Sequence, residues 1–430
     1  MTGRFVFQTM IVICLLTSCN KQKKSIIRVA DYEKYLTTGT HEAREKAEAE
    51  KDFWENKLAQ HPDQYTYLQP LAAAYTTMFE VSGDIDCLLK ADTLLVQANA
   101  RQNQKNAALQ RTLARNYITQ HRFKEALALL KKAENIGEKL KATQKMLFDV
   151  HLELGNTAKA EHYLAEIKAL NEFDYLIRLS KWSDHTGNLE AAIKYLEKAV
   201  ALAEDSHNQS LQLWGYSNLA DFYGHAGRIE DAYNYYLKVL EIDPDYTYAL
   251  KGIAWIAFSH EKNIAAANRI LDAIAKKHET PDLYLLKAEL AEYAGDETLR
   301  AEHLEKYRQL LEAHHYGVMY DKYNTLLWAE DEENTDKALT LAQREVANRP
   351  TAQSYDLLAW AYFKKGDAEQ ALNIAREHVA GKTSEPEVQY HLAEIYKANG
   401  MEKEVKTLKK ELLESRFELG PNMEKRILGL

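Results

Sequence analysis

The chain has 430 residues, of which 55 are basic and 64 acidic, giving a formal net charge of −9 at pH 7. This acidic balance argues against nucleic acid as the main partner, because phosphate binding requires a basic surface. Only seven prolines and 17 glycines interrupt a sequence rich in helix-favouring residues, and no window sustains a strand-like alternation of apolar and polar residues. We therefore expect an all-α protein.

The first twenty residues have the pattern of an export signal. Arg4 is followed by a mainly apolar run over 5–16, which is too short to span a membrane. The run ends in the motif LTSC, Leu16 to Cys19. This motif resembles the lipobox of bacterial lipoproteins, which implies that residues 1–18 are a signal peptide and that the Cys19 thiol carries a lipid anchor. An ordinary cleaved signal with an incidental cysteine is the alternative.

The residues after the lipid site bear on localisation. In bacterial lipoproteins, an aspartate directly after the lipidated cysteine resembles an inner-membrane retention signal. This chain has Asn20 at that position, so the lipoprotein resemblance implies the outer membrane of a Gram-negative bacterium. Lys21, Lys23 and Lys24 depart from the acidic pattern of surface-exported lipoproteins, which favours the periplasmic face. Residues 19–40 are then a lipid-anchored linker, whose lysines either contact anionic headgroups or form a solvated spacer. We expect the membrane to be contacted by the lipid anchor only.

Cysteine usage agrees with this processing. Cys14 would leave with the signal peptide and Cys19 would carry lipid, so only Cys87 would remain as a thiol. No intramolecular disulfide can then form, even in an oxidising compartment. Cys87 lies in an apolar stretch, and we expect it to be buried.

Residues 41–62 are highly charged and predict an N-terminal capping helix. Trp54 and Leu58 are four residues apart and therefore share one face of this helix. We expect that face to dock on the first unit of the repeat array described next, because such arrays need polar-faced caps for solubility.

Residues 213–246 form one unit of a 34-residue helical repeat. Its small, aromatic and turn residues have a fixed spacing, which resembles that of the tetratricopeptide repeat, two antiparallel helices joined by a glycine turn. Glycine suits this turn because it tolerates a positive φ. The residues that carry the resemblance are Tyr216, Leu219, Ala220, Tyr223, Gly227, Ala232, Tyr236 and Pro244.

The same turn pattern recurs along residues 63–419, with a full match over 359–371. We count about ten repeats, and the resemblance implies a right-handed α-solenoid of helix pairs with helical caps. We expect one elongated array, because each unit of a solenoid contacts only its neighbours. Gly420 and Pro421 are expected to end the last helix and to leave 420–430 as a C-terminal tail.

The resemblance also implies that the first helix of each unit lines a concave groove. We expect aromatic and charged side chains there to bind a partner, since aromatic rings offer a large contact area at little entropic cost. The alternative is that these rings pack against the next helix. The candidate groove residues are Trp214, Asp221, Tyr248, Lys251, Trp255, Phe258, Trp360, Phe363 and Tyr390.

A second candidate site is a carboxylate-binding patch made of Arg111, Arg115 and Lys145 on the inner face of the early repeats. Arg111 and Arg115 are four residues apart and share a helix face. The patch partly resembles the carboxylate clamp of chaperone-binding tetratricopeptide proteins, although the asparagines of that clamp are not matched and Asp149 stands nearby instead. Solvation or intramolecular pairing of these side chains is the alternative.

Patterns for catalysis are missing: the sequence has no G-x-S-x-G, no glycine-rich phosphate loop and no H-E-x-x-H zinc helix. We therefore expect neither an enzyme nor a cofactor or metal site. The predicted function is a lipid-anchored scaffold that binds other envelope proteins or peptides. A glycan-capturing lipoprotein of an outer-membrane uptake system and a self-assembling structural protein are the alternatives, and the oligomeric state is left open.

Overall fold

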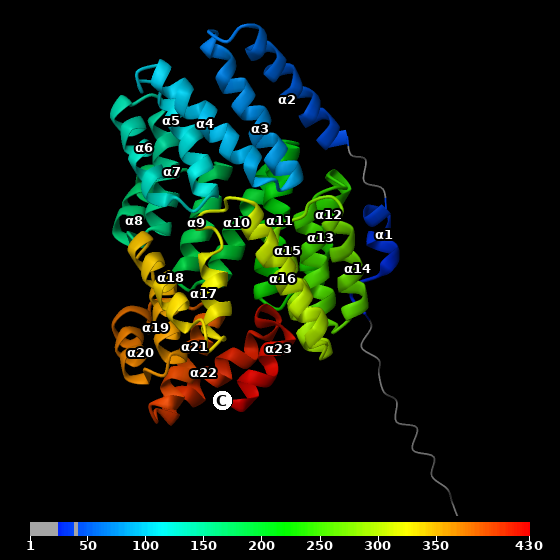
Figure 1. Ribbon diagram of the computed structural model, residues 1–430, viewed down its shortest axis with the longest axis vertical. Coiled ribbons are helices and arrows are strands. Elements are labelled where there is room, and N and C mark those ends of the chain that lie inside the picture. The colour runs from blue at the N-terminus through cyan, green and yellow to red at the C-terminus, as the bar shows by residue number, and fades with distance from the viewer. Residues whose placement is uncertain (1–24, 38–41) are drawn as a thin grey trace, which may run out of the picture.

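The computed structural model describes residues 25–37 and 42–430 (Figure 1). These residues form helices α1 to α23, three short 3₁₀- or π-helical turns, and no strand. The prediction of an all-α solenoid is therefore confirmed for this part of the chain. Among the same residues, no helix is both long and apolar enough to cross a membrane. The predicted signal peptide and Cys19 lie outside the described residues.

Ten antiparallel helix pairs follow one another along the solenoid. In two pairs a π-helical turn, η2 (Ile256–His260) or η3 (Ala375–Val379), extends one of the helices. The pairs are α3 (Leu68–Ser82) with α4 (Ile85–Arg101), α5 (Ala107–Thr119) with α6 (Phe123–Ile136), α7 (Leu140–Glu153) with α8 (Thr157–Glu166), α9 (Phe173–His185) with α10 (Leu189–Asp205), α11 (Gln209–His225) with α12 (Ile229–Ile242), α13 (Thr247–Trp255) with α14 (Ile264–Ala275), α15 (Pro281–Ala294) with α16 (Glu297–Ala313), α17 (Asp321–Ala329) with α18 (Thr335–Asn348), α19 (Ala352–Lys364) with α20 (Ala368–Ile374), and α21 (Pro386–Ala398) with α22 (Glu402–Glu414).

The turn inside a pair follows from its sequence. Gly187 has a φ of 79°, and Asn188 then caps α10 by accepting a hydrogen bond from an N–H of its first turn. His121 takes the same left-handed conformation, with a φ of 58°, at a turn where the repeat has no glycine. The small residues on either side of a turn, such as Ala220 and Ala232, are buried, so the two helices approach closely.

The N-terminal end of the solenoid is covered by α2 (Glu42–Gln60), which packs on α3. Trp54 and Leu58 lie against the apolar core of the first pairs, and the Trp54 ring also contacts Tyr67. In α4, Cys87 is buried as expected, and burial raises the pKa of its thiol to about 11.

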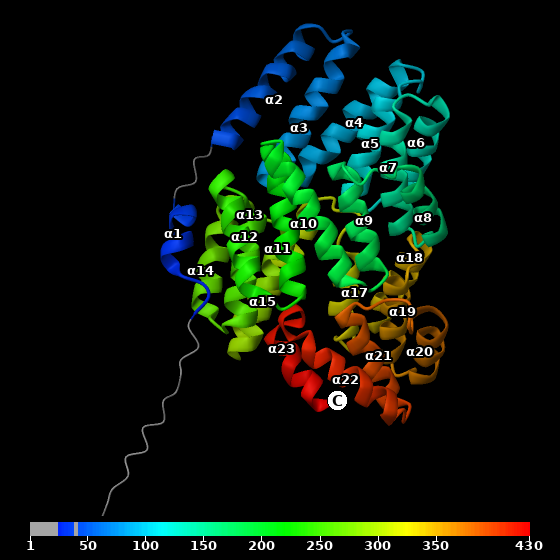
Figure 2. The same cartoon turned by 180° about the vertical axis from the view of Figure 1, so that it is seen from behind.

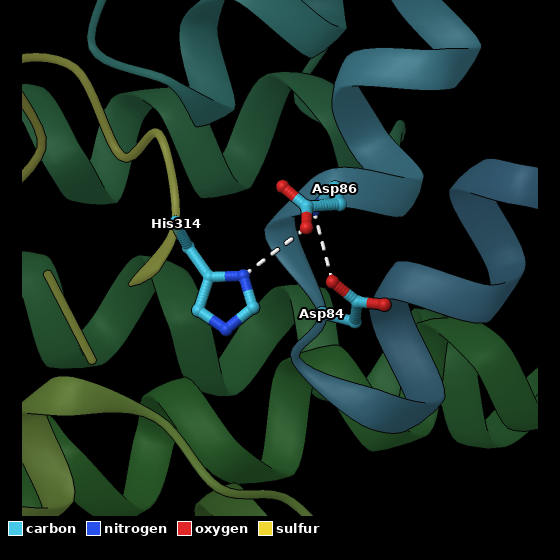
Figure 3. Close-up of side chains that lie close together, drawn as sticks. All are labelled: Asp84, Asp86 and His314. Carbon is cyan, nitrogen blue, oxygen red and sulfur yellow. Dashed lines mark hydrogen bonds and ion pairs between the residues drawn. The ribbon is translucent and has the colours of Figure 1, made fainter. Parts of the chain in front are cut away.

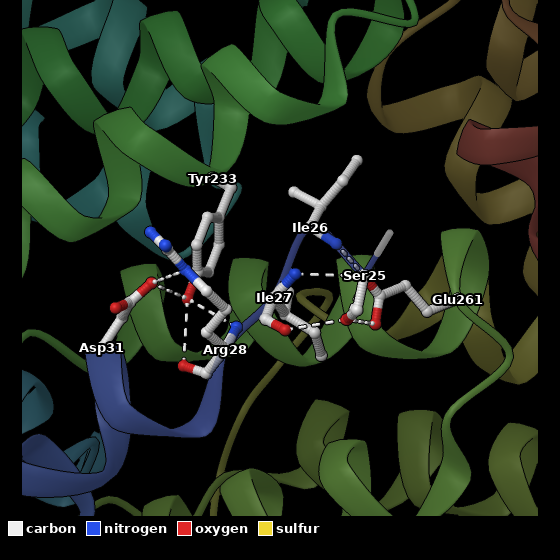
Figure 4. A network of polar contacts seen from close by, with 7 residues as sticks. All are labelled: Ser25, Ile26, Ile27, Arg28, Asp31, Tyr233 and Glu261. Carbon is white, nitrogen blue, oxygen red and sulfur yellow. Dashed lines mark hydrogen bonds and ion pairs between the residues drawn. The ribbon is translucent and has the colours of Figure 1, made fainter. Parts of the chain in front are cut away.

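Residues 25–37, here called the N-terminal strap, lie against the middle of the solenoid (Figure 4). The Ser25 hydroxyl and the N–H groups of the next two residues donate to the Glu261 carboxylate at 2.6–3.0 Å. Tyr32, in α1 (Val29–Thr37), is buried against α12 and α14. The described part of the predicted linker is thus docked, because its few apolar side chains meet an apolar surface formed by residues more than 200 positions later.

Successive turns of the superhelix touch one another. The Lys124 ammonium donates to the Ala347 carbonyl at 2.5 Å, and Arg349 pairs with Glu153 at 3.5 Å. A Cβ added at Gly155 would lie 2.9 Å from a carbonyl oxygen of the segment before α19. In both views α18 lies beside α8 (Figures 1 and 2). The array is therefore closed rather than elongated, because the rotation from pair to pair brings the late pairs back onto the early ones.

The C-terminus folds back into the solenoid as α23 (Arg416–Gly429), which bends at Gly420. The Trp255 indole N–H and the Ser259 hydroxyl both donate to the Phe417 carbonyl, at 3.1 Å and 2.6 Å. Residues 420–430 thus differ from the tail that the sequence predicted. Pro421 follows the bend at Gly420 and begins the second helical segment of α23. A proline is well accommodated in the first turn of a helix, where its missing N–H is not needed.

Candidate functional cavity

The inner face of the later pairs has an open cavity of about 1450 Å³, lined by residues of α11–α13, α15–α19, α21 and α23 and of the loops between them. Small-molecule pockets have volumes of roughly 300–1,000 Å³, so this cavity has room for a longer ligand. Its lining mixes aromatic rings with many charged groups. A space of this kind on the concave side of a solenoid is suited to an extended segment of another chain.

Six of the nine predicted groove residues line this cavity, and three do not. Trp214 is exposed outside it and contacts the Phe173 ring edge-to-face, whereas Phe258 and Phe363 pack into apolar cores. The predicted residues in the lining are Asp221, Tyr248, Lys251, Trp255, Trp360 and Tyr390.

Asp221 accepts hydrogen bonds from two tyrosines at one side of the cavity. The Tyr248 hydroxyl donates to Asp221 at 2.6 Å, and the Tyr236 hydroxyl donates to its other oxygen. Burial raises the pKa of Asp221, which these hydrogen bonds oppose. The Tyr248 ring remains exposed, so one face of this network is open to a ligand.

The neighbouring side chains of α13 are engaged within the chain. Lys251 pairs with Asp282 of α15 at 2.7 Å. Burial acts to raise the pKa of Asp282, but Lys251 outweighs it and the pKa is lowered. Trp255 is held by its hydrogen bond to the backbone of α23. This part of the predicted groove therefore binds the C-terminal helix of the same chain.

Phe258, Trp360 and Tyr390 are buried, so they serve mainly as packing residues. Phe258 lies in η2, where a π-helical turn holds an extra residue and alters the direction of the side chains, and its ring enters the core. The Trp360 ring stacks on His391 with their centroids 4.1 Å apart. These three rings therefore fit the alternative interpretation, in which the aromatic side chains pack within the solenoid instead of binding a partner.

The opposite end of the cavity is acidic. Burial and the nearby Glu292 and Glu387 together raise the pKa of Glu289 to about 8, and Arg426 opposes them. Burial also raises the pKa of Glu385. Carboxyl groups thus gather where α15, α21 and α23 meet, and their proximity favours the protonated form of Glu289.

The candidate carboxylate-binding patch is engaged by the chain itself. The Arg111 guanidinium is buried and donates to the Glu138 carbonyl at 2.9 Å and to the Thr143 hydroxyl at 3.1 Å. Lys145 pairs with Asp174 at 2.7 Å. Arg115 is exposed and lies near Glu80 of α3, where burial raises the pKa of that carboxyl and the Arg115 charge partly opposes the rise. Arg111 and Lys145 therefore follow the alternative of intramolecular pairing, and Arg115 is solvated.

One cluster of potential metal ligands occurs among the described residues (Figure 3). Asp84, Asp86 and His314 each place an oxygen or nitrogen within 4.8 Å of the others. Asp84 caps α4 by accepting from the Asp86 N–H at 3.0 Å, and His314 lies 3.1 Å from Asp86 where two superhelical turns meet. A helix cap and one polar contact explain this grouping without a metal.

Several lining residues on α15 and α17 were not predicted, among them Glu289, Tyr323 and Trp328. Glu289 follows Ala288, which lies seven residues before Gly295 just as Ala220 lies seven before Gly227, so the repeat register was a usable signal. Tyr323 and Trp328 lie in the pair α17 and α18, whose turn has no glycine, and this left their register undefined.

Family profiles described as tetratricopeptide repeat match residues 180–275 and 352–377. These two segments are similar to tetratricopeptide repeats. They cover α10 to α14 and all of α19 and α20, and they contribute Asp221, Tyr248 and Trp360 to the cavity lining. No curated protein matches the chain.

Several solved structures show some similarity to the chain. A tetratricopeptide repeat protein from Parabacteroides merdae is 17% identical, with 57% of this chain and 93% of that chain covered and a TM-score of 0.39. The human IFIT1 dimer with PPP-AAAA is 15% identical, with 76% of each chain covered and a TM-score of 0.47. Pseudomonas aeruginosa PilF is 16% identical, with 49% and 94% covered and a TM-score of 0.37.

Proposed function

We propose that the protein is a lipid-anchored scaffold that holds a segment of another envelope protein in its concave cavity. The observation that carries the proposal is the cavity itself, about 1450 Å³ of space on the inner face of tetratricopeptide repeats. Its lining combines open aromatic rings with charged groups, the surface chemistry that peptide recognition uses. Binding of this kind requires no chemical step from the protein.

The anchor follows from the sequence. A lipid on Cys19 would leave only five residues before the docked strap begins at Ser25. Five residues span at most about 18 Å, so the strap would keep the solenoid close to the outer membrane. The proposed periplasmic face would then present the cavity to envelope proteins.

Photo-crosslinking in the native envelope tests the scaffold. Tyr323 lines the cavity and is 41% exposed, whereas Tyr65 lies outside it and is 42% exposed. A photo-reactive phenylalanine analogue at each position should capture the same envelope protein from position 323 and not from position 65. Equal capture from both positions, or none from either, contradicts binding in the cavity.

The anchor has its own test. The Cys19→Ala variant should move from the membrane fraction to the soluble fraction, and mass spectrometry of the wild-type N-terminal peptide should show the mass of a lipid on Cys19. A wild-type protein that begins at another residue without lipid contradicts the anchor while leaving the scaffold untouched.

A further inference from the structure

Charges in the cavity lining are unbalanced. Carboxylates outnumber lysine and arginine side chains by ten to six. Five of the six basic groups are ion-paired, and the sixth, Lys337, lies over the Trp328 ring. The basic groups are thus already engaged, and the surplus charge available to a ligand is negative.

Several carboxylates of the lining form no ion pair. Among the described residues, the side chains of Glu289, Glu312 and Glu385 form neither a hydrogen bond nor an ion pair. Glu289 is partly buried beside Trp255 and Gly420, whereas Glu385 is exposed just before α21. A partly buried carboxylate without a partner is unfavourable, so a cation supplied from outside would relieve Glu289.

The chain itself shows how this wall receives a cation. Arg426 of α23 enters the cavity and pairs with Glu292 at 3.0 Å, one helical turn from Glu289. Beside this pair, Asn422 donates to the Glu289 carbonyl at 2.9 Å. The carboxylate of Glu289 remains open to the cavity. A second basic side chain can therefore take a place next to Arg426.

Aromatic rings accompany the acidic end. Trp255, Tyr323 and Trp328 line the cavity and are only partly buried or exposed. Such rings receive the apolar stems of lysine and arginine and attract their cationic heads. The volume exceeds what a small amine needs, which favours a peptide segment over a metabolite.

From these observations we infer that the cavity binds a segment of its partner that is rich in lysine or arginine, with a basic side chain received at Glu289. This inference rests on the proposed scaffold function and names the chemistry of the bound segment. The aromatic rings hold the apolar parts of the segment, and the acidic end sets its charge preference.

Peptides of defined charge test the inference on the full chain purified in detergent. Two fluorescent peptides of equal length, one alternating leucine with lysine and the other leucine with glutamate, are titrated and followed by anisotropy. We expect the lysine peptide to bind at least about tenfold more tightly, with an advantage that shrinks as salt is added. Equal affinity for the two peptides overturns the inference.

Variants locate the effect. The variant Glu289→Gln should weaken binding of the lysine peptide about tenfold. The matched control Glu302→Gln alters an exposed residue outside the cavity and should leave the affinity unchanged. An unchanged affinity in Glu289→Gln, with the fold verified by circular dichroism, overturns the assignment. If spermidine displaces the lysine peptide when the two are compared at the same concentration of positive charge, the site binds small amines, and the inference of a peptide ligand is overturned.

The charge inference and the scaffold fail in different ways. Capture of an envelope protein from position 323, combined with no preference for the lysine peptide, would retain the scaffold and reject the basic segment. Preferential binding of the lysine peptide without capture in the envelope would retain the acidic site and reject the scaffold.

Discussion

The inner faces of the early and late helix pairs are built from the same repeat but differ in how their charges are satisfied. In the early pairs, Arg111 and Lys145 bind oxygen atoms of the neighbouring pair. In the late pairs a cavity remains, and Glu289 lacks an ionic partner. The repeat thus determines how helices pair, whereas individual side chains decide whether the concave face is filled or left open to a ligand.

The largest expected effect concerns the wall behind the cavity. Phe258→Ala removes a fully buried ring and should lower the free energy of unfolding by about 3–5 kcal/mol, because the core cannot collapse around the space left behind. Denaturant unfolding measures this. Tyr323→Ala, which removes an exposed ring from the cavity lining, is the control and should change stability by less than about 1 kcal/mol. Similar losses in both variants would contradict the division between packing and binding rings.

The next effect separates stability from binding in the early pairs. Arg111→Ala deletes the donors to Glu138 and Thr143 and should destabilise the fold by about 2–3 kcal/mol, since hydrogen bonds of charged groups are strong and their acceptors would be left unpaired. The exposed Arg101 serves for comparison, with little change expected on replacement by alanine. Loss of partner capture without loss of stability would instead assign Arg111 to binding.

A third variant loosens the contact between early and late pairs. Gly155 and Gly295 have similar φ angles, 69° and 75°, so alanine strains both turns by about 1 kcal/mol. A Cβ at position 155 would also meet the Pro350 carbonyl oxygen at 2.9 Å, whereas nothing lies within 4 Å at position 295. Gly155→Ala should therefore melt at a lower temperature than Gly295→Ala. Equal melting temperatures would show that the turns of the superhelix do not hold each other.

The smallest effect depends on pH. Glu289 has a folded-state pKa of about 8 against an ordinary value of 4.5, so between these values the folded state binds more protons than the unfolded state. This contribution to stability therefore falls as pH rises from about 5 to 8. Glu289→Gln should flatten that slope and stabilise the fold at pH 8 on the order of 1 kcal/mol.

Unfolding at pH 6 and pH 8 measures this change, and Glu302→Gln should retain the wild-type slope. The groups that face Glu289 are Glu292 on its own helix, Glu387 on α21 and Arg426 on α23. A steeper slope in Glu289→Gln would show that Arg426 holds the carboxylate ionised in the folded state.

The helix pairs could be predicted because their signals are local. Ala220, Gly227 and Ala232 lie within one unit, and their spacing resembles that of the tetratricopeptide repeat, which implies two packed helices and a turn. The closed superhelix could not be predicted this way, since small rotations accumulate over many pairs before Gly155 meets Pro350. Contacts between turns therefore leave no periodic trace in the sequence.

The candidate site was predictable only where the helical register was regular. Asp221, Tyr248 and Lys251 were placed on the concave side and do line the cavity. Phe258 was misplaced because a π-helical turn interrupts the register. The sequence did not indicate that α23 occupies the groove near Trp255, because the contacting residue, Phe417, lies 162 positions later in the chain.

The docked strap also constrains the order in which parts of the protein can fold. Ile26 binds Glu261, which follows it by 235 residues. A chain synthesised at about 5–20 residues per second contains the strap roughly 12–47 s before Glu261 is added. The strap therefore cannot dock until its binding site has been made. Its docking is a late folding step, which completes the middle of the solenoid and does not initiate folding there.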